Sequence, residues 1–173
     1  ARVPSSAQVT VAGIAGAPAG SVTISPAVEM GDFVIWQRNG EPAYQLASLV
    51  DDEEYGMDCI VRGSDLLPST GAQMWLAERL EYTHFRQARF LHHGLLLDSG
   101  GGKLSKSEGA VSLRAMRERW PTPEPLLAGF ATWLGIGVEH PASVADLLPG
   151  FAPERIPLAD RSWADFCAVT GLS

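Results

Sequence analysis

Two absences limit what this chain of 173 residues can be: it has few cysteines and no long apolar run. Cys59 and Cys167 lie far apart, and neither belongs to a C-x-x-C pair or to a Cys/His cluster with metal-ligand spacing. We therefore expect no zinc site, and a reducing, cytoplasmic localisation. Residues 9–22 are apolar but contain Pro18 and fall short of the roughly 20 residues that a membrane span needs. We expect a soluble protein without a membrane partner.

Basic residues are scarce overall but concentrated in one segment. The net charge of −7 argues against a nucleic-acid partner, because phosphate binding depends on Lys and Arg. Between residues 79 and 119, however, eight basic residues stand against four acidic ones, a local charge of +4 that leaves −11 on the remainder. On charge alone, such a segment is more often a solvated helix face than a binding surface.

The hydrophobic content of 46% is enough for one packed core with a small satellite domain. In its first part the chain shows patterns of short strands within residues 1–30, a strand at 33–36 followed by a tight turn at Asn39-Gly40, and a strand at 59–61. A helix is then predicted from caps at Ser69 and Thr70 to about Tyr82, followed by a buried strand at 95–97. Two more helices are predicted at 111–120 and 125–134, the second capped by Thr122. This order predicts an α/β sheet domain followed by a small helical unit, with a boundary near residue 110.

A glycine-rich stretch, Ser99–Gly102, cannot hold regular structure by itself, so we expect a mobile loop over residues 99–109. The run Lys103-Leu104-Ser105-Lys106-Ser107 follows it directly. Two lysines three residues apart can close over a polyphosphate and stabilise the charge on leaving pyrophosphate when a carboxylate attacks an α-phosphate. The glycines supply the hinge for such a closure. As a bare pattern, the run is equally compatible with a solvated surface loop.

The K-L-S-K-S run resembles the KMSKS signature of class I aminoacyl-tRNA synthetases, in the form common in the glutamyl group. Four upstream blocks are similar to that group in order and spacing: Gly31–Ile35, Gly40–Ala47, Val50–Asp52 and Val61–Leu67. The resemblance implies that residues 1–110 are the second half of a Rossmann-like catalytic domain, including the K-L-S-K-S loop, and that residues 111–173 are a small helical C-terminal unit.

The resemblance also implies site residues. In the family, the tyrosine of P-A-Y-x-L-A and the arginine of V-R-G-x-D-L line the amino-acid pocket, and Tyr44 and Arg62 occupy these positions. An arginine can hold a carboxylate through two charge-assisted bonds, and a tyrosine hydroxyl adds a directional partner. Without the family, core packing for Tyr44 and a surface ion pair for Arg62 would be the ordinary roles. We expect both to bind glutamate in one cleft near the C-terminal edge of the sheet.

For the loop, the resemblance implies that Lys103, Ser105 and Lys106 bind ATP and that Lys106 and Lys103 are catalytic. ATP is then a substrate, and Mg²⁺ is expected with it. The implied reaction is ATP-dependent activation of L-glutamate and its transfer to tRNA.

Two other clusters invite a metal or acid/base interpretation. Asp51 and Asp52 could shift each other's protonation, but the acidic run Asp51–Glu54 is more typical of a solvated turn, and the resemblance makes either aspartate a group that supports the pocket residues. His92 and His93 are neighbours on an expected strand, so one should pack inward and the other outward, and no third ligand is near. We therefore expect no metal site.

The H-x-G-H element that binds ATP in complete synthetases of this class is absent from the sequence. We expect the chain alone to be inactive, and a missing N-terminal half as a partner, whether the chain is a fragment, a natural truncation or one member of a split pair. About 66 residues follow the signature run, which is short for an anticodon-binding domain. This favours the relative that adds glutamate to queuosine in tRNA(Asp), with tRNA(Asp) as the preferred partner.

Three alternatives remain at this point. The chain could be a truncated ordinary glutamyl-tRNA synthetase, or a non-catalytic module that binds tRNA or a partner synthetase. An unrelated Rossmann-like domain would require the four matched blocks to be accidental.

Overall fold

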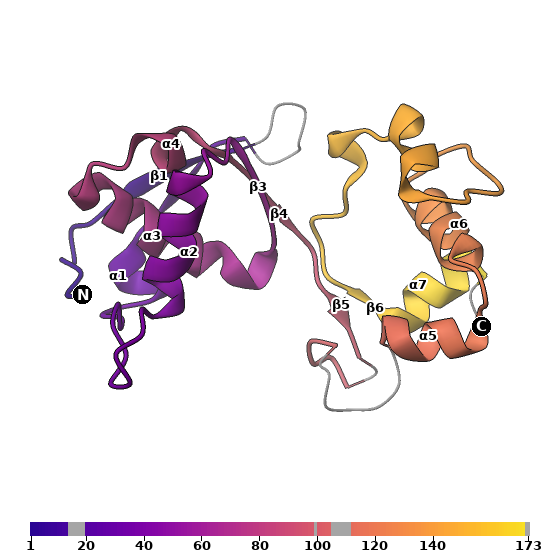
Figure 1. Ribbon diagram of the computed structural model, residues 1–173, viewed down its shortest axis with the longest axis horizontal. Helices are drawn as coiled ribbons and strands as arrows, with labels where there is room; N and C mark the ends of the chain where they lie inside the picture. The colour runs from indigo at the N-terminus through magenta and orange to yellow at the C-terminus, as the bar shows by residue number, and fades with distance from the viewer. Residues whose placement is uncertain (14–19, 99, 105–111, 172–173) are drawn as a thin grey trace. The chain divides into compact units, whose positions relative to one another are not determined.

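The computed structural model describes residues 1–13, 20–98, 100–104 and 112–171. The chain forms two compact units, Ala1–His93 and Gly94–Ser173 (Figure 1). They divide upstream of residue 110, because strand β5 (Leu96–Leu97) pairs with the short strand β6 (Arg161–Ser162) inside the second unit. In the described part of the chain, no helix is long and apolar enough to cross a membrane.

A four-stranded sheet of order β2-β1-β4-β3 forms the first unit's scaffold. Strands β1 (Val9–Gly13), β4 (Arg89–His93) and β3 (Cys59–Gly63) run parallel, and β2 (Val22–Ile24) is antiparallel to β1. Side chains of β3 alternate between exposed and buried, so Ile60 and Arg62 share the buried face. The register places Arg62 opposite His92. This mixed α/β fold with a parallel sheet confirms the predicted fold class, and β3 confirms the predicted strand at 59–61.

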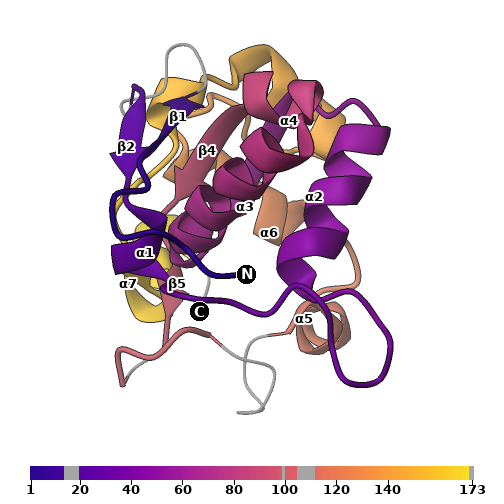
Figure 2. The same cartoon turned by 90° about the vertical axis from the view of Figure 1, so that its left-hand side faces the viewer.

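Helices α1 (Pro26–Glu29), α2 (Tyr44–Glu54), α3 (Leu67–Leu80) and α4 (Thr83–Gln87) pack around this sheet (Figure 2). Helix α3 is central, because it contacts β1 and all three other helices. The buried core consists of Val9, Val11, Ile24, Leu49, Ile60, Met74, Trp75, Leu76, Ala77, Phe85, Ala88 and Phe90. Burying each large apolar side chain contributes roughly 1.5–3 kcal/mol, so this core holds α2 and α3 firmly in place.

The segment before α2 is not the expected strand at 33–36. It forms one isolated bridge between Trp36 and Pro42, because the backbone groups of Phe33 and Ile35 bond to Ala1 and Ala43 rather than to a sheet. The predicted tight turn is confirmed: Gln37 N donates to Glu41 O at 2.8 Å, and Gly40 has a φ of +87°.

Helix α3 begins earlier than predicted. It starts at Leu67, directly after the 3-10 turn η1 (Ser64–Leu66), with Pro68 in its first turn. Proline suits that place because its missing N–H would have no partner there. Ser69 and Thr70, which we predicted as caps, therefore lie inside the helix and are buried.

The acidic run Asp51–Glu54 is the last turn of α2, so the prediction of a solvated turn is wrong. Glu53 accepts hydrogen bonds from the backbone N–H groups of Thr83, His84 and Phe85 at the start of α4. Helix starts have free N–H donors that favour such an acceptor. Two acids of the run, Asp52 and Glu53, thus have specific partners, whereas Asp51 and Glu54 are exposed.

The second unit contains helices α5 (Leu113–Arg119), α6 (Glu124–Trp133) and α7 (Trp163–Thr170) and the 3-10 turns η2 (Val144–Gly150) and η3 (Pro153–Arg155). Helix α6 packs on α7 through fully buried Phe166, whose ring lies 4.8 to 5.1 Å from the rings of Phe130, Trp133 and Trp163. Both predicted helices are confirmed within a few residues, although Pro123 rather than Thr122 occupies the N-cap of α6.

Candidate functional site

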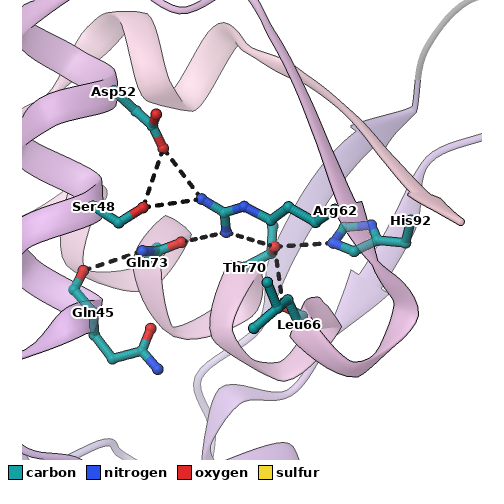
Figure 3. Close-up of polar contacts among 8 residues, drawn as sticks. All are labelled: Gln45, Ser48, Asp52, Arg62, Leu66, Thr70, Gln73 and His92. Carbon is teal, nitrogen blue, oxygen red and sulfur yellow. Dashed lines mark hydrogen bonds and ion pairs between the residues drawn. The ribbon is translucent and has the colours of Figure 1, made fainter. Parts of the chain in front are cut away.

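A buried arginine at the end of β3 is the centre of the candidate site. Arg62 is 8% exposed, and its Nη1 donates to Thr70 Oγ1 at 3.1 Å and to Gln73 Oε1 at 2.5 Å (Figure 3). Its Nη2 donates to Ser48 Oγ at 3.4 Å and to Asp52 Oδ2 at 3.1 Å. All four terminal N–H groups thus have acceptors, which a buried guanidinium requires because an unpaired buried charge is strongly unfavourable.

Helix α3 supplies the deeper pair of acceptors. Thr70 and Gln73 are both 0% exposed, and their spacing of three residues puts them on one face of the helix. Gln73 Nε2 also donates to the backbone carbonyl of Gln45 in α2, at 3.3 Å. The amide of Gln73 therefore connects α2, α3 and the guanidinium of Arg62.

The hydroxyl oxygen of Thr70 has three polar neighbours. It lies 3.1 Å from Arg62 Nη1, 3.2 Å from the carbonyl oxygen of Leu66 and 3.0 Å from His92 Nε2. A hydroxyl offers one proton and two lone pairs. Arg62 takes one lone pair, and when Leu66 accepts the proton, His92 Nε2–H donates to the second lone pair. Donation from Thr70 to Leu66 O thus corresponds to the Nε2–H tautomer of His92, whereas the Nδ1–H tautomer would accept the Thr70 proton instead.

The environment of His92 favours the neutral form of its imidazole. Burial lowers its pKa from the ordinary value, and repulsion from the Arg62 guanidinium and from His93 adds to the effect. The ring also stacks on Phe90, with centroids 6.2 Å apart. A neutral ring next to a buried cation avoids placing two positive charges side by side.

Asp52 is the anionic partner of Arg62. Burial raises the pKa of its carboxyl, and the Arg62 charge and the Ser48 hydroxyl oppose that shift. Its side chain retains 23% exposure, against 7% for that of Arg62. The ion pair therefore joins a buried cation to a carboxylate that still reaches solvent.

Tyr44 lies in the first turn of α2 and is 50% exposed. Ser48 follows it by four residues, so the two side chains lie on the same helix face. Because Ser48 contacts Arg62, Tyr44 belongs to the face of α2 that carries this contact. Tyr44 is not part of the core, and the ion pair of Arg62 is buried on the arginine side rather than lying at the surface. The roles of both residues in glutamate binding stay predictions.

The glycines before Lys103 adopt a defined turn. Asp98 Oδ1 accepts hydrogen bonds from the N–H groups of Gly100 at 2.8 Å and Gly102 at 2.9 Å. Asp98 N donates to Gly102 O at 2.7 Å. The prediction that this stretch holds no regular structure by itself is confirmed for residues 100–102, which form a loop stabilised by the Asp98 side chain. The predicted mobility of the loop stays a prediction. Ser99 lies outside the described residues.

Of the predicted ATP-binding residues, only Lys103 falls within the described part of the chain. It forms an isolated antiparallel bridge with Leu97, and Leu104 N donates to Leu96 O at 3.1 Å. Ser105 and Lys106 lie outside the described residues. The roles of these three residues therefore stay predictions.

Sequence reasoning missed most of the side chains around Arg62, namely Ser48, Thr70, Gln73 and His92. A signal was present for Gln73, because it is a long polar residue on the otherwise apolar stretch that follows Thr70. The sequence predicted that His92 lies on a strand. Its position opposite Arg62 follows only from the parallel register of β3 and β4, which the sequence does not show.

Comparison with known proteins identifies the family. The profile described as the class I tRNA synthetases (E and Q), catalytic domain, matches residues 4–146. The chain belongs to this family. It is 40% identical over 138 residues to the Glutamyl-Q tRNA(Asp) synthetase of Xanthomonas oryzae and 37% identical over 140 residues to Glutamate–tRNA ligase 2 of Syntrophus aciditrophicus. The matches cover 75% and 79% of this chain, respectively.

Among solved structures, the chain resembles a glutamate tRNA ligase from Elizabethkingia meningosepticum, crystallised in complex with its amino acid, with a TM-score of 0.71 at 20% identity. This match covers 97% of the present chain and 36% of that ligase, and it supports the synthetase-like fold. The chain spans 43% of the Xanthomonas relative and 27% of the Syntrophus relative. It is thus a glutamyl-type synthetase family domain, similar to a part of each relative.

Proposed function

We propose that this synthetase domain binds L-glutamate at Arg62 and Tyr44, within an enzyme that activates glutamate with ATP and transfers it to tRNA. The observation that carries the proposal is the buried, fully oriented guanidinium of Arg62 near the carboxyl end of a parallel strand. Ligands of open α/β sheets bind at that edge. An oriented guanidinium is suited to a carboxylate, and Tyr44 lies on the adjacent helix face.

In the proposed reaction, a carboxylate oxygen of glutamate forms a bond to the α-phosphorus of ATP, and the bond from that phosphorus to the bridging oxygen of pyrophosphate breaks. Lys103 and Lys106 stabilise the charge of the leaving pyrophosphate, with Ser105 contributing to ATP binding and Mg²⁺ accompanying the nucleotide. The glutamyl group then passes to a hydroxyl of the tRNA, and AMP is released.

Binding of glutamate can be tested on the chain itself by NMR titration with L-glutamate. Arg62→Lys keeps the charge but loses the forked geometry, so we expect at least tenfold weaker binding. Tyr44→Phe should weaken binding a few-fold through the lost hydroxyl. Tyr55→Phe is the matched control, because Tyr55 is exposed at the other end of α2. Equal behaviour of the two tyrosine variants would contradict the assigned role of Tyr44.

Activation can be tested by glutamate-dependent exchange of pyrophosphate into ATP. We propose that the chain alone gives background exchange, because orientation of ATP contributes on the order of 7–11 kcal/mol and the sequence contains no H-x-G-H element. Adding a segment with that element should restore exchange, and Lys106→Ala should then lower turnover more than glutamate affinity. Arg114→Ala is a charge-matched control. Robust exchange by the lone chain would refute the requirement for an H-x-G-H element. No exchange in any combination would favour a non-catalytic tRNA-binding module.

For the acceptor, we propose queuosine of tRNA(Asp). The relatives that support this include the Glutamyl-Q tRNA(Asp) synthetase of Nocardia farcinica, which is 39% identical over 126 residues. The glutamate–tRNA ligases support the second candidate, an ordinary glutamyl-tRNA synthetase. Glutamylation should be compared on queuosine-containing tRNA(Asp), the same tRNA without queuosine, and tRNA(Glu). Transfer to tRNA(Glu) alone would refute the queuosine proposal.

A further inference from the structure

The two ends of the Arg62 guanidinium have different surroundings. Both acceptors of Nη1, Thr70 and Gln73, are 0% exposed and come from the central helix α3. Both acceptors of Nη2 come from α2 and are only partly buried. The Ser48 contact is also the longest of the four, at 3.4 Å. One end of the guanidinium is thus fixed in the core, and the other is held by groups that can be replaced.

The side chains of α2 show from which end a ligand would approach. Tyr44 and Ser48 share one face of this helix, so the proposed tyrosine ligand lies one turn from an acceptor of Nη2. Asp52, the other acceptor, is a carboxylate and presents to Nη2 the same chemical group as glutamate. An incoming carboxylate at this end replaces one anionic acceptor by another, whereas at Nη1 it would have to displace two fully buried groups.

From this asymmetry we propose that Thr70 and Gln73 are positioning residues, which hold Nη1 so that Nη2 receives the ligand carboxylate in place of Asp52. The proposal rests on the proposed glutamate site. Thr70 acts through its hydroxyl, which is itself fixed by Leu66 O and by His92 Nε2. Gln73 acts through Oε1, while its Nε2 is anchored on the carbonyl of Gln45.

Two variants of Thr70 separate positioning from packing. Thr70→Val keeps the shape and removes the hydroxyl, whereas Thr70→Ser keeps the hydroxyl and removes a methyl group. We expect Thr70→Val to raise the dissociation constant for L-glutamate roughly five- to tenfold and Thr70→Ser to leave it within about twofold. A role of Thr70 in packing alone predicts the reverse order, because the methyl group is buried. That order, or equal effects of the two variants, would refute positioning by Thr70.

The other end of the guanidinium should respond with the opposite sign. Asp52→Asn removes the competing negative charge, so we expect tighter glutamate binding, by a few-fold, although the chain becomes less stable. Weaker binding in Asp52→Asn would refute the assignment of Nη2 as the end that meets the ligand.

At the Nη1 end, Gln73→Met keeps the length of the side chain and removes the amide, so it should weaken glutamate binding about tenfold.

Nitrogen-15 NMR of the Arg62 side chain gives a readout that needs no ligand. Slow rotation should give resolved Nη signals in the full chain and in Thr70→Ser, and averaged signals in Thr70→Val. Averaged signals in the unaltered chain would refute the fixed end directly. If the signals are resolved but the unaltered chain does not respond to L-glutamate, the glutamate site fails and this proposal fails with it. If the unaltered chain binds glutamate and Thr70→Val binds equally well, only the positioning role fails.

Discussion

Every buried polar or charged side chain among the described residues belongs to the first unit, where Arg62, Ser69, Thr70 and Gln73 lie within or beside the core. The buried side chains described in the second unit are apolar, and aromatic rings around Phe166 hold α6 to α7. Burying polar groups is unfavourable unless each finds a partner. The contrast indicates that the second unit is held together by apolar contacts, whereas the first also keeps an oriented cation beside its apolar core.

The largest expected effect tests this contrast at its centre. Arg62→Met leaves Asp52, Thr70 and Gln73 without their shared donor. Removing one partner of a buried pair destabilises by about 3–5 kcal/mol, and we expect the lower end because the carboxylate left behind still reaches solvent. Amide hydrogen exchange should report the loss at Ile60 and not at Ala131 in the second unit.

A double variant provides the control for Arg62→Met. Adding Asp52→Leu removes the stranded carboxylate, so it should recover part of the lost stability. If the double variant is less stable than Arg62→Met, the buried pair is not the cause of the loss.

Phe166→Ala should destabilise the second unit by about 3 kcal/mol, near the lower end for such a change, because the surrounding rings are only partly buried and can close over the gap. Hydrogen exchange at Ala131 should accelerate, while Ile60 should be unaffected. Val169→Ala is the control on the exposed side of α7. Equal acceleration in both units would contradict their separate cores.

Glu53→Ala removes the acceptor for three N–H groups of α4, a loss on the order of 1 kcal/mol by comparison with helix caps. Desolvation acts to raise the pKa of Glu53, but the hydrogen bonds from Phe85, His84 and Thr83 outweigh it, so the pKa is lowered from 4.5. With a lowered folded pKa, the stabilisation is present above the unfolded value and is lost as pH falls through the folded one.

Urea unfolding at pH 7 and at acid pH measures this effect. The difference between the unaltered chain and Glu53→Ala should shrink as pH falls below about 4. Glu54→Ala, at the exposed neighbouring position, is the control and should leave the free energy of unfolding nearly unchanged. A difference that persists unchanged in acid would show that the carboxylate charge does not matter.

The smallest effect is expected at the surface of the second unit. His140 Nδ1 lies 2.7 Å from Glu124 Oε1, and the two side chains are 80% and 44% exposed, respectively. Exposed pairs contribute at most about 1 kcal/mol, so Glu124→Gln should barely change the unfolding midpoint. A loss as large as that of Glu53→Ala would show that the second unit also relies on charge.

Much of the first unit could be predicted from local patterns. The β-type run at residues 59–61 and the Asn39-Gly40 turn were confirmed because neighbouring residues determine them. The start of α3 was missed because Ser69 and Thr70 are good caps. In the structure the helix begins at Leu67 instead, directly after the 3-10 turn and with Pro68 in its first turn. The strand at 33–36 was missed because its backbone groups found partners in the N-terminus and in the segment before α2.

The candidate site was predictable only in part. Tyr44 and Arg62 were identified through a family resemblance, and their pattern alone suggested ordinary structural roles. The partners of Arg62 come from residues 48, 52, 70 and 73, which meet only after β3 and two helices have packed. Such long-range pairing leaves no local signal, apart from polar residues at positions where an apolar helix face is expected.

Asp52 and Glu53 are consecutive residues of α2, about 100° apart around its axis, and each is attached to a different element. One holds the helix to β3 and the other to the start of α4, so α2 can neither rotate nor slide by one residue without losing both attachments. A residue inserted between Gly56 and Asp58 would leave this alignment intact. One inserted between Tyr44 and Ser48 would turn the tyrosine by about 100° away from the arginine, with the fold preserved and the proposed site lost.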